Sequence, residues 1–226
     1  MRMPSLDERL QAAADLFTAC DTGADIGADH GRLSCYLLHH QICNRMIVAD
    51  ISADSLAKAQ RLLSLHDLAD RADFRVADGL EGIRNVNVQC VAICGMGGRL
   101  LSDILKKGET LLHGAELVIS CHTEIPLIRK TLCALSYAID DERLIRAKKR
   151  FYIVIKALPG RAQYREKELY LGPLLMRRKP DLWPQYLRWR EGVVACEQGH
   201  VQQLQWIREE IANGNADGEN SAGMVE

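Results

Sequence analysis

A strand-turn-helix segment near the N-terminus constrains the fold more than any other part of the sequence. The apolar-ended run from Gly23 to Ile26 arrives at Gly27, and Gly31 precedes the apolar segment 33–38. Glycine tolerates positive φ and lets a ligand approach the backbone closely, and the first N–H groups of a helix favour electron-rich ligand groups. Such a segment is typical of the ligand-binding edge of a doubly wound α/β fold. An ordinary turn without a ligand is the alternative.

The acidic character of this turn favours one class of ligand. Asp29 stands where the dinucleotide-binding motif G-x-G-x-x-G has its middle glycine. A carboxylate there would repel a pyrophosphate, and it would tolerate or attract the sulfonium and amino groups of S-adenosyl-L-methionine. The turn therefore favours a cationic ligand such as S-adenosyl-L-methionine, and an NAD-dependent dehydrogenase is disfavoured.

Two further acidic residues follow predicted strands at positions that suit a nucleoside. Asp50 ends the apolar run 45–50, about 20–25 residues after the glycines, where a carboxylate can accept both hydroxyls of a ribose. The alternative is that Asp50 only caps the next helix. Asp78 and Gly79 lie at the end of the run 74–80, where Asp78 could accept from the exocyclic amine of adenine. An Asp-Gly turn explains that pair equally well.

A glycine cluster follows the most apolar strand, 88–94. Gly95, Gly97 and Gly98 flank Met96 and bring the backbone close to a neighbour. Tight packing of the following helix would explain one of these glycines more easily than three. An unbroken apolar run of this kind is typical of a central strand in a parallel sheet, so this loop belongs to the same ligand-binding edge.

The order of the elements predicts an α/β fold with a Rossmann-like doubly wound sheet, mostly parallel, with an antiparallel last strand. The strands 137–146 and 150–157 form a closing hairpin. The sequence Ser5 to Glu8 predicts a capping box for the first helix, 5–17. Leu158 to Gly160 breaks the pattern, so we predict a first domain over 1–160, a helical or coiled-coil-like domain over 161–212 and a disordered tail over 213–226.

Charge is concentrated in one segment. Residues 144–190 carry 13 Lys and Arg against 3 Asp and Glu, whereas residues 1–143 carry 15 against 20 and residues 191–226 carry 1 against 7. A local excess of positive charge favours an anionic partner, nucleic acid first. The predicted RNA-binding residues are Arg99, Lys148, Lys149, Arg150, Arg177, Arg178 and Lys179.

The cysteines and the hydropathy pattern point to a soluble cytoplasmic protein. The 8 cysteines are scattered and form no C-x-x-C pair, so we expect reduced thiols and no metal site. No signal peptide is recognisable, and no apolar run approaches the roughly 18 residues that a membrane span needs. A monomer is the simplest expectation for the oligomeric state.

Several of these motifs carry a family resemblance. The segments 24–30 (ADIGADH), 78–80 (DGL), 95–98 (GMGG) and 171–173 (LGP), in this order and spacing, resemble the bacterial tRNA (adenine(22)-N1)-methyltransferase family, TrmK. The likeness covers roughly residues 5–190. It implies a class I S-adenosyl-L-methionine-dependent methyltransferase domain, followed by a small helical domain that helps to grip tRNA, and methylation of an adenine at N1.

The resemblance also implies residue roles. The turn at Gly27, Asp29 and His30 corresponds to the methionine side of the cofactor, and the loop 95–98 to the methyl group. The chain departs from the family pattern at Asp50, where glutamate is usual, and at 120–122, where Gln-Pro-Asn would face the target base. The predicted cofactor-binding residues are Asp25, Gly27, Asp29, His30, Gly31, Asp50, Ile51, Asp78, Gly79, Gly95, Met96, Gly97 and Gly98.

Asp29 is the predicted catalytic residue. Methylation at N1 leaves the adenine ring cationic, and a nearby carboxylate would stabilise the developing charge; a salt bridge or a turn-capping bond is the alternative role. The sequence lacks the Asn/Asp-Pro-Pro-aromatic motif that grips an exocyclic amine, which favours a ring nitrogen as the target. The competing functions are a small-molecule methyltransferase and a non-catalytic RNA-binding protein that retains the fold.

Overall fold

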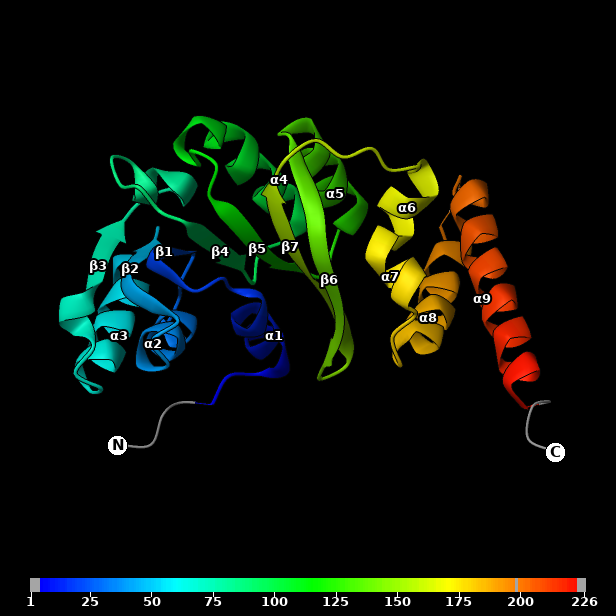
Figure 1. Cartoon of the computed structure of the whole chain (residues 1–226), viewed down its shortest axis with the longest axis horizontal. Helices are drawn as coiled ribbons and strands as arrows, with labels where there is room; N and C mark the ends of the chain where they lie inside the picture. The colour runs from blue at the N-terminus through cyan, green and yellow to red at the C-terminus, as the bar shows by residue number, and fades with distance from the viewer. Residues whose placement is uncertain (1–4, 198, 223–226) are drawn as a thin grey trace. The chain divides into compact units, whose positions relative to one another are not determined.

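The computed structural model describes residues 5–197 and 199–222. The chain divides into two compact units, and the division lies between Gln163 and Tyr164. The first unit is built on a β-sheet, and the second consists of helices (Figure 1).

The first unit contains a seven-stranded sheet with the order β3-β2-β1-β4-β5-β7-β6. The first five strands are parallel, and β7 runs antiparallel to both β5 and β6. The predicted doubly wound sheet with an antiparallel last strand is therefore confirmed. The strands are β1 (Cys20–Ile26), β2 (Cys43–Asp50), β3 (Ala72–Val76), β4 (Cys90–Cys94), β5 (Glu116–Cys121), β6 (Tyr137–Ala147) and β7 (Arg150–Pro159).

The direction of winding reverses at β1, because β1 pairs with β2 on one side and with β4 on the other. In open α/β sheets the crevice at such a switch point, at the carboxyl ends of the strands, is where ligands bind. The apolar runs of β2, β4 and β5 are almost completely buried, as expected for strands covered on both faces.

Helices cover both faces of this sheet (Figure 1). One face carries α1 (Glu8–Leu16), α2 (Arg32–His39) and α3 (Ala53–Ser64), and the other carries α4 (Gly98–Lys107) and α5 (Ile125–Ala134). Between them lie the short 3-10 helices η1 (Ala69–Arg71), η2 (Gly79–Ile83) and η3 (Glu109–Leu111). Each long helix buries one apolar stripe against the sheet, so the core lies on both sides of it.

The start of α1 differs from the prediction. Its N-cap is Asp7, whose Oδ1 accepts a hydrogen bond from the Leu10 N–H at 2.8 Å. The predicted capping box of Ser5 with Glu8 is therefore wrong, because Glu8 is already the first helical residue. Aspartate is as good an N-cap as serine, and here it begins the helix two residues later than Ser5 would.

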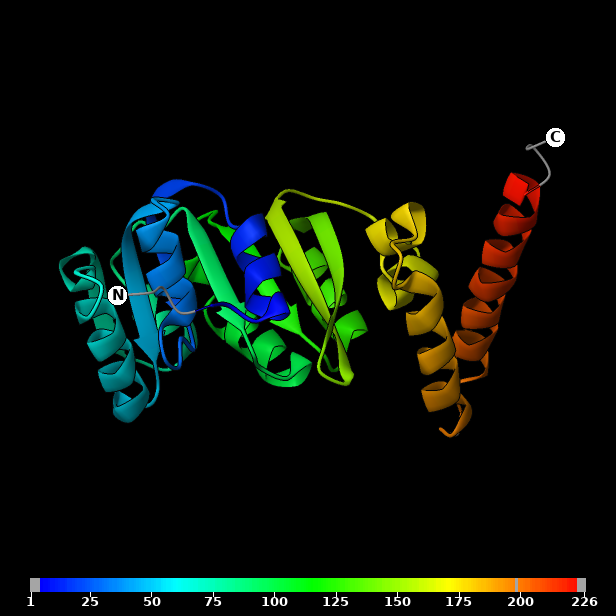
Figure 2. The same ribbon diagram turned by 90° about the horizontal axis from the view of Figure 1, so that it is seen from below.

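The second unit contains α6 (Glu166–Leu171), α7 (Pro173–Arg178), α8 (Trp183–Ala195) and α9 (Val201–Ala222). Helices α8 and α9 contact one another (Figure 2). Helix α6 was not predicted. The disordered tail predicted over 213–226 does not agree with α9, which continues to Ala222 in a stretch without proline; residues 223–226 lie outside the described residues.

No helix within the described ranges combines the length and the apolar character that crossing a membrane would require.

Candidate active site

A cavity of about 640 Å³ opens at the carboxyl ends of β1, β2 and β4. Its volume lies within the range of about 300–1,000 Å³ that is typical of small-molecule sites. The switch point of the sheet therefore holds a cavity large enough for a nucleoside cofactor. The predicted residues that line it are Asp25, Gly27, Asp29, His30, Asp50, Ile51, Asp78, Gly79, Gly95 and Met96.

Gly27 makes the sharp turn at the end of β1 with φ +71°. A Cβ atom at this position would overlap Cε of Met96, which reaches over from the loop after β4. The N–H groups of Gly27 and Ala28 both donate to the Ala49 carbonyl, at 2.8 and 3.1 Å. These two amides hold the turn against β2 and are therefore not available to a ligand.

Asp50 lines the rim of the cavity and is fixed by two backbone donors. Its Oδ2 accepts from the Asp29 N–H at 3.0 Å, and its Oδ1 accepts from the Ser52 N–H at 2.8 Å. The next helix is capped instead by Ser52, whose Oγ accepts from the Ser55 N–H. A carboxylate oxygen has two lone pairs, so each oxygen of Asp50 can accept one further bond from a ligand hydroxyl.

Asp29 has a positive φ of 50° and an exposed side chain. Its Oδ2 is 2.7 Å from Nδ1 of His30, a contact that is a salt bridge when the imidazole is protonated, which is the alternative to a catalytic role. The catalytic role of Asp29 stays a prediction. The structure does place its carboxylate on the cavity wall.

Asp25 lies beneath this rim and is 3% exposed. Its Oδ2 accepts a hydrogen bond from Oγ of Ser34 at 2.7 Å. Burial raises the pKa of Asp25 to about 6, the Ser34 bonds oppose this change, and the nearby Asp50 carboxylate adds to it. A buried carboxylate without a cationic partner is costly, and a positively charged ligand in the cavity would supply that partner.

The cavity wall also includes an exposed acid and exposed apolar side chains. Asp78 pairs with Nζ of Lys107 at 2.6 Å on the surface. Ile51 is 73% exposed and Leu100 is 55% exposed, and both line the cavity. Large apolar side chains that are exposed to solvent at a cavity wall can pack against the faces of a planar ring.

Three predicted cofactor residues do not line the cavity in the described structure. A Cβ atom on Gly31 would lie 2.7 Å from Cβ of Ala59, and one on Gly98 would overlap the Thr123 carbonyl. Gly97 lies beside the Thr123 hydroxyl. These glycines allow α2 to pack on α3 and α4 to pack on the loop after β5, so any contact with the cofactor stays a prediction.

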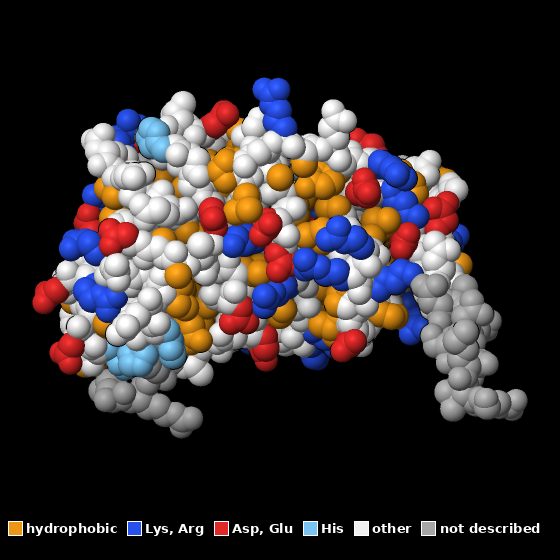
Figure 3. Space-filling model, viewed as in Figure 1, with side chains coloured by type: hydrophobic (Ala, Val, Ile, Leu, Met, Phe, Trp, Pro, Cys, Tyr) orange, Lys and Arg blue, Asp and Glu red, His pale blue; other side chains and the backbone are white. Residues whose placement is uncertain are grey.

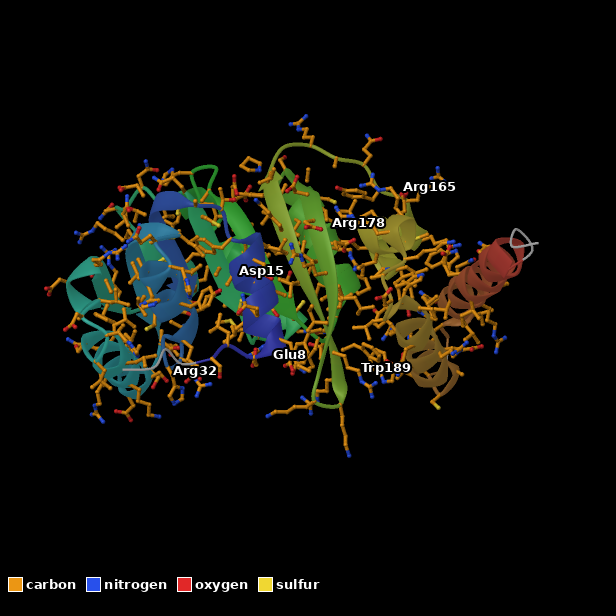
Figure 4. All side chains as sticks on the ribbon, turned by 60° about the horizontal axis from the view of Figure 1, so that its bottom comes forward. Glu8, Asp15, Arg32, Arg165, Arg178 and Trp189 are labelled. Carbon is orange, nitrogen blue, oxygen red and sulfur yellow. The ribbon has the colours of Figure 1, made fainter. Side chains whose placement is uncertain are left out.

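From the sequence, the helix before the first strand was expected to lie over the ligand crevice or to pack on the sheet, but its site residues were not identified. Asp7, Arg9 and Leu10 line the cavity from the start of this helix, and Arg32 lines it from the start of α2. Figure 4 shows Glu8 and Arg32 at the same end of the first unit, with Asp15 further along α1. The only signal in the sequence was a helix preceding the first strand, which does not say which of its residues reach the site.

The predicted RNA-binding residues lie in three places. Arg99 opens α4 and is paired with Glu124, with Nη2 and Oε1 3.0 Å apart. The exposed cluster 148–150 forms the turn between β6 and β7, and the exposed cluster 177–179 ends α7 in the second unit. Figure 3 shows Lys and Arg side chains mixed with Asp and Glu on the face in view.

Comparison with known proteins agrees with this geometry. Residues 6–155 match the model of a family described as a methyltransferase domain. The chain is 31% identical over 156 residues to the tRNA (adenine(22)-N(1))-methyltransferase of Bacillus subtilis, which covers 69% of this chain and 66% of that relative.

Solved structures extend the likeness over both units. A Streptococcus pneumoniae protein crystallised with S-adenosyl-L-methionine matches with a TM-score of 0.87 at 22% identity, covering 92% of this chain and 100% of that one. Mycoplasma capricolum TrmK bound to S-adenosyl-homocysteine matches with a TM-score of 0.77 at 22% identity, covering 93% and 96%. At these identities the structures confirm the fold. The chain thus belongs to the methyltransferase-domain family, and within it is similar to the tRNA (adenine(22)-N(1))-methyltransferases.

Proposed function

We propose that this protein transfers a methyl group from S-adenosyl-L-methionine to N1 of adenine 22 in tRNA. The observation that carries the proposal is the cavity at the switch point, whose wall contains the carboxylates of Asp25, Asp29, Asp50 and Asp78. Such a wall suits a ligand with a sulfonium, an amino group and two ribose hydroxyls. The Bacillus subtilis relative bears the name of this activity.

The residues present fit this cofactor. Asp50 is held by two backbone N–H groups and keeps lone pairs for the ribose hydroxyls. Asp78 can accept a hydrogen bond from the adenine amine if the ligand replaces Lys107 as its partner. Ile51 and Leu100 offer apolar surfaces to the faces of the adenine ring. Gly95 and Met96, in the loop after β4, also line the cavity, and the methyl group would lie beside this loop.

When bound, S-adenosyl-L-methionine supplies an electrophilic methyl carbon, which the lone pair of adenine N1 attacks in line as the carbon–sulfur bond breaks. The nucleophile needs no activation, so the protein contributes mainly proximity and orientation. The exposed carboxylate of Asp29 stabilises the positive charge that develops on the ring.

The RNA is held by cationic residues outside the cavity. We assign residues 1–160 to the methyltransferase domain and 161–212 to the tRNA-contact domain. In the second unit, Trp189 is 41% exposed on α8, and Arg190 stands over its ring at 5.8 Å from the centroid. Basic and aromatic side chains together suit phosphates and unstacked bases. A small-molecule methyltransferase would have no use for this concentration of positive charge.

Mass spectrometry of nucleosides tests the proposal directly. The purified protein is incubated with S-adenosyl-L-methionine and a tRNA transcript carrying adenine at position 22, and with a matched transcript carrying guanine there. We expect 1-methyladenosine in the first transcript and none in the second. Methylation at another nucleotide, or none at all with cofactor bound, would contradict the proposal. Light scattering on the same sample tests the expectation of a monomer.

A further inference from the structure

A second group of three side chains, of which Arg9 lines the cavity, is not accounted for by the cofactor. His122 follows β5, Tyr152 lies in β7, and Arg9 lies in α1. The rings of His122 and Tyr152 have centroids 5.1 Å apart with an interplanar angle of 52°. The guanidinium carbon of Arg9 lies over the Tyr152 ring, 5.5 Å from its centroid.

This group is placed beside the loop that would face the methyl group. Arg9 lines the cofactor cavity, and its Nη1 lies 3.1 Å from where a Cβ atom on Gly95 would be. The Gly95 N–H donates to the Ser120 carbonyl at 3.2 Å, which holds the loop after β4 against the end of β5. In the register of β5 with β7, Cys121 is opposite Ile153, which sets Tyr152 next to His122.

The group also faces the basic turn. Arg150 and Tyr152 are two residues apart in one strand, so their side chains point to the same face of the sheet. Helix α1, which carries Arg9, packs on β7 as well. A nucleotide on this face could therefore place its phosphate on the exposed Arg150 while its base reaches Tyr152.

His122 offers the base an uncharged ring. Burial lowers the pKa of His122, and the positive charges of Arg150 and Arg9 lower it further, so the imidazole is neutral at pH 7. Its Nδ1 is buried and has no hydrogen-bond partner among the described residues. A neutral ring does not repel the methylated base, and the face of a tyrosine ring attracts a planar cation. In the free protein the planar cation on that face is the guanidinium of Arg9.

We propose that His122 and Tyr152 form the subsite that stacks the target adenine, and that Arg9 covers the Tyr152 ring until the base arrives. The subsite rests on the proposed tRNA activity. It assigns a role to His122, which stands in the loop where this chain departs from the family pattern.

The test compares Tyr152→Leu with Tyr152→Phe, which keeps the ring. Stacking of a base on an aromatic side chain contributes enough binding free energy that Tyr152→Leu should lower kcat/KM for tRNA by about tenfold to hundredfold. Tyr152→Phe keeps the ring and should retain at least about a third of the wild-type kcat/KM. The matched control is Tyr36→Leu, because Tyr36, in α2, forms a similar aromatic pair with His40, with ring centroids 4.2 Å apart. Calorimetry with S-adenosyl-L-methionine should give the wild-type affinity for all three variants and shows that each is folded.

A binding measurement supplies a second readout. A tRNA carrying 2-aminopurine at position 22 is bound in the presence of S-adenosyl-homocysteine. The base should stay quenched with wild type and Tyr152→Phe, and become bright with Tyr152→Leu, because an extruded base that does not stack fluoresces. Equal brightness and equal kcat/KM for the Leu and Phe variants would overturn the subsite. A wild-type protein that methylates no tRNA would instead overturn the proposed function.

Discussion

The backbone N–H of Asp29 donates a hydrogen bond of 3.0 Å to Oδ2 of Asp50. This bond ties the turn after β1 to the end of β2, the two segments that form one wall of the cavity. A hydrogen bond from a backbone N–H to a carboxylate is charge-assisted and stronger than a neutral one. The wall is therefore organised before any ligand arrives, and the carboxylate of Asp50 is the group that organises it.

We predict that Asp50→Asn weakens S-adenosyl-L-methionine binding by tenfold or more. The amide nitrogen of asparagine cannot accept from either backbone N–H, so the variant loses one hydrogen bond of the wall and one acceptor for the ribose. Isothermal titration calorimetry measures the affinity. Asp54→Asn is the control, because Asp54 is exposed in the first turn of α3. Equal affinities for the two variants would exclude a ribose-binding role for Asp50.

Asp25 makes both stability and cofactor binding depend on pH. Its pKa is about 6 in the folded protein, against an ordinary value of 3.8. Between these values the native state holds a proton that the unfolded chain releases, so stability falls as pH rises through the window, by roughly 3 kcal/mol in all. Urea unfolding without ligand at pH 4.5 and pH 7 should show about 2 kcal/mol of this loss, because pH 4.5 already lies inside the window, and Asp25→Asn should abolish it.

Cofactor affinity should change in the opposite direction. A sulfonium is favoured by the ionised form of Asp25, so S-adenosyl-L-methionine should bind more tightly as pH rises towards 7. S-adenosyl-homocysteine lacks the sulfonium charge and should show a weaker dependence. Calorimetry with both ligands across this range makes the comparison, and parallel curves for the two would show that Asp25 does not respond to the sulfonium.

Two Gly→Ala substitutions should have opposite effects on stability. Gly27→Ala puts a Cβ atom into Met96 and forces alanine to a φ of +71°, a conformation that costs roughly 1–2 kcal/mol. A Cβ atom on Gly192, in α8, would have no atom within 4 Å, so Gly192→Ala should stabilise the protein by about 0.5–1 kcal/mol. Thermal melts measure both changes. Because Gly27→Ala also displaces Met96, it alone should lose the stabilisation that added cofactor provides.

Charge reversal of the turn between β6 and β7 should affect the RNA and spare the cofactor. The triple variant Lys148→Glu, Lys149→Glu, Arg150→Glu should weaken tRNA binding by tenfold or more and flatten its salt dependence. The charge-matched control is Arg45→Glu, Lys58→Glu, Arg61→Glu, whose three sites are also exposed. Filter binding at several salt concentrations measures both. If cofactor affinity drops to the same extent, the turn has a structural role instead.

Much of the fold could be predicted from local patterns. Apolar runs ending in Gly or Asp identified β1, β2 and β4, and because strand ends of a parallel sheet meet at one edge, the site could be placed there. Helix α6 was missed because its six residues are too few to show a helical period.

The sequence could not show which side chains reach the cavity from another layer of the fold. Arg9 belongs to α1, and its approach to Gly95 depends on how that helix packs across the sheet. The same holds for Gly98, whose glycine spacing suggested a ligand but whose neighbour in the structure is Thr123. Periodicity shows which face of a helix is buried, and it does not show what that face meets.

The openness of Ile51 and Leu100 has a thermodynamic consequence. Both side chains face water at the cavity wall, and a bound adenine ring would cover them. Removing apolar surface from water gives a negative change in heat capacity. The enthalpy of cofactor binding should therefore become more favourable with each degree of warming, and a polar residue at position 51 should flatten that slope.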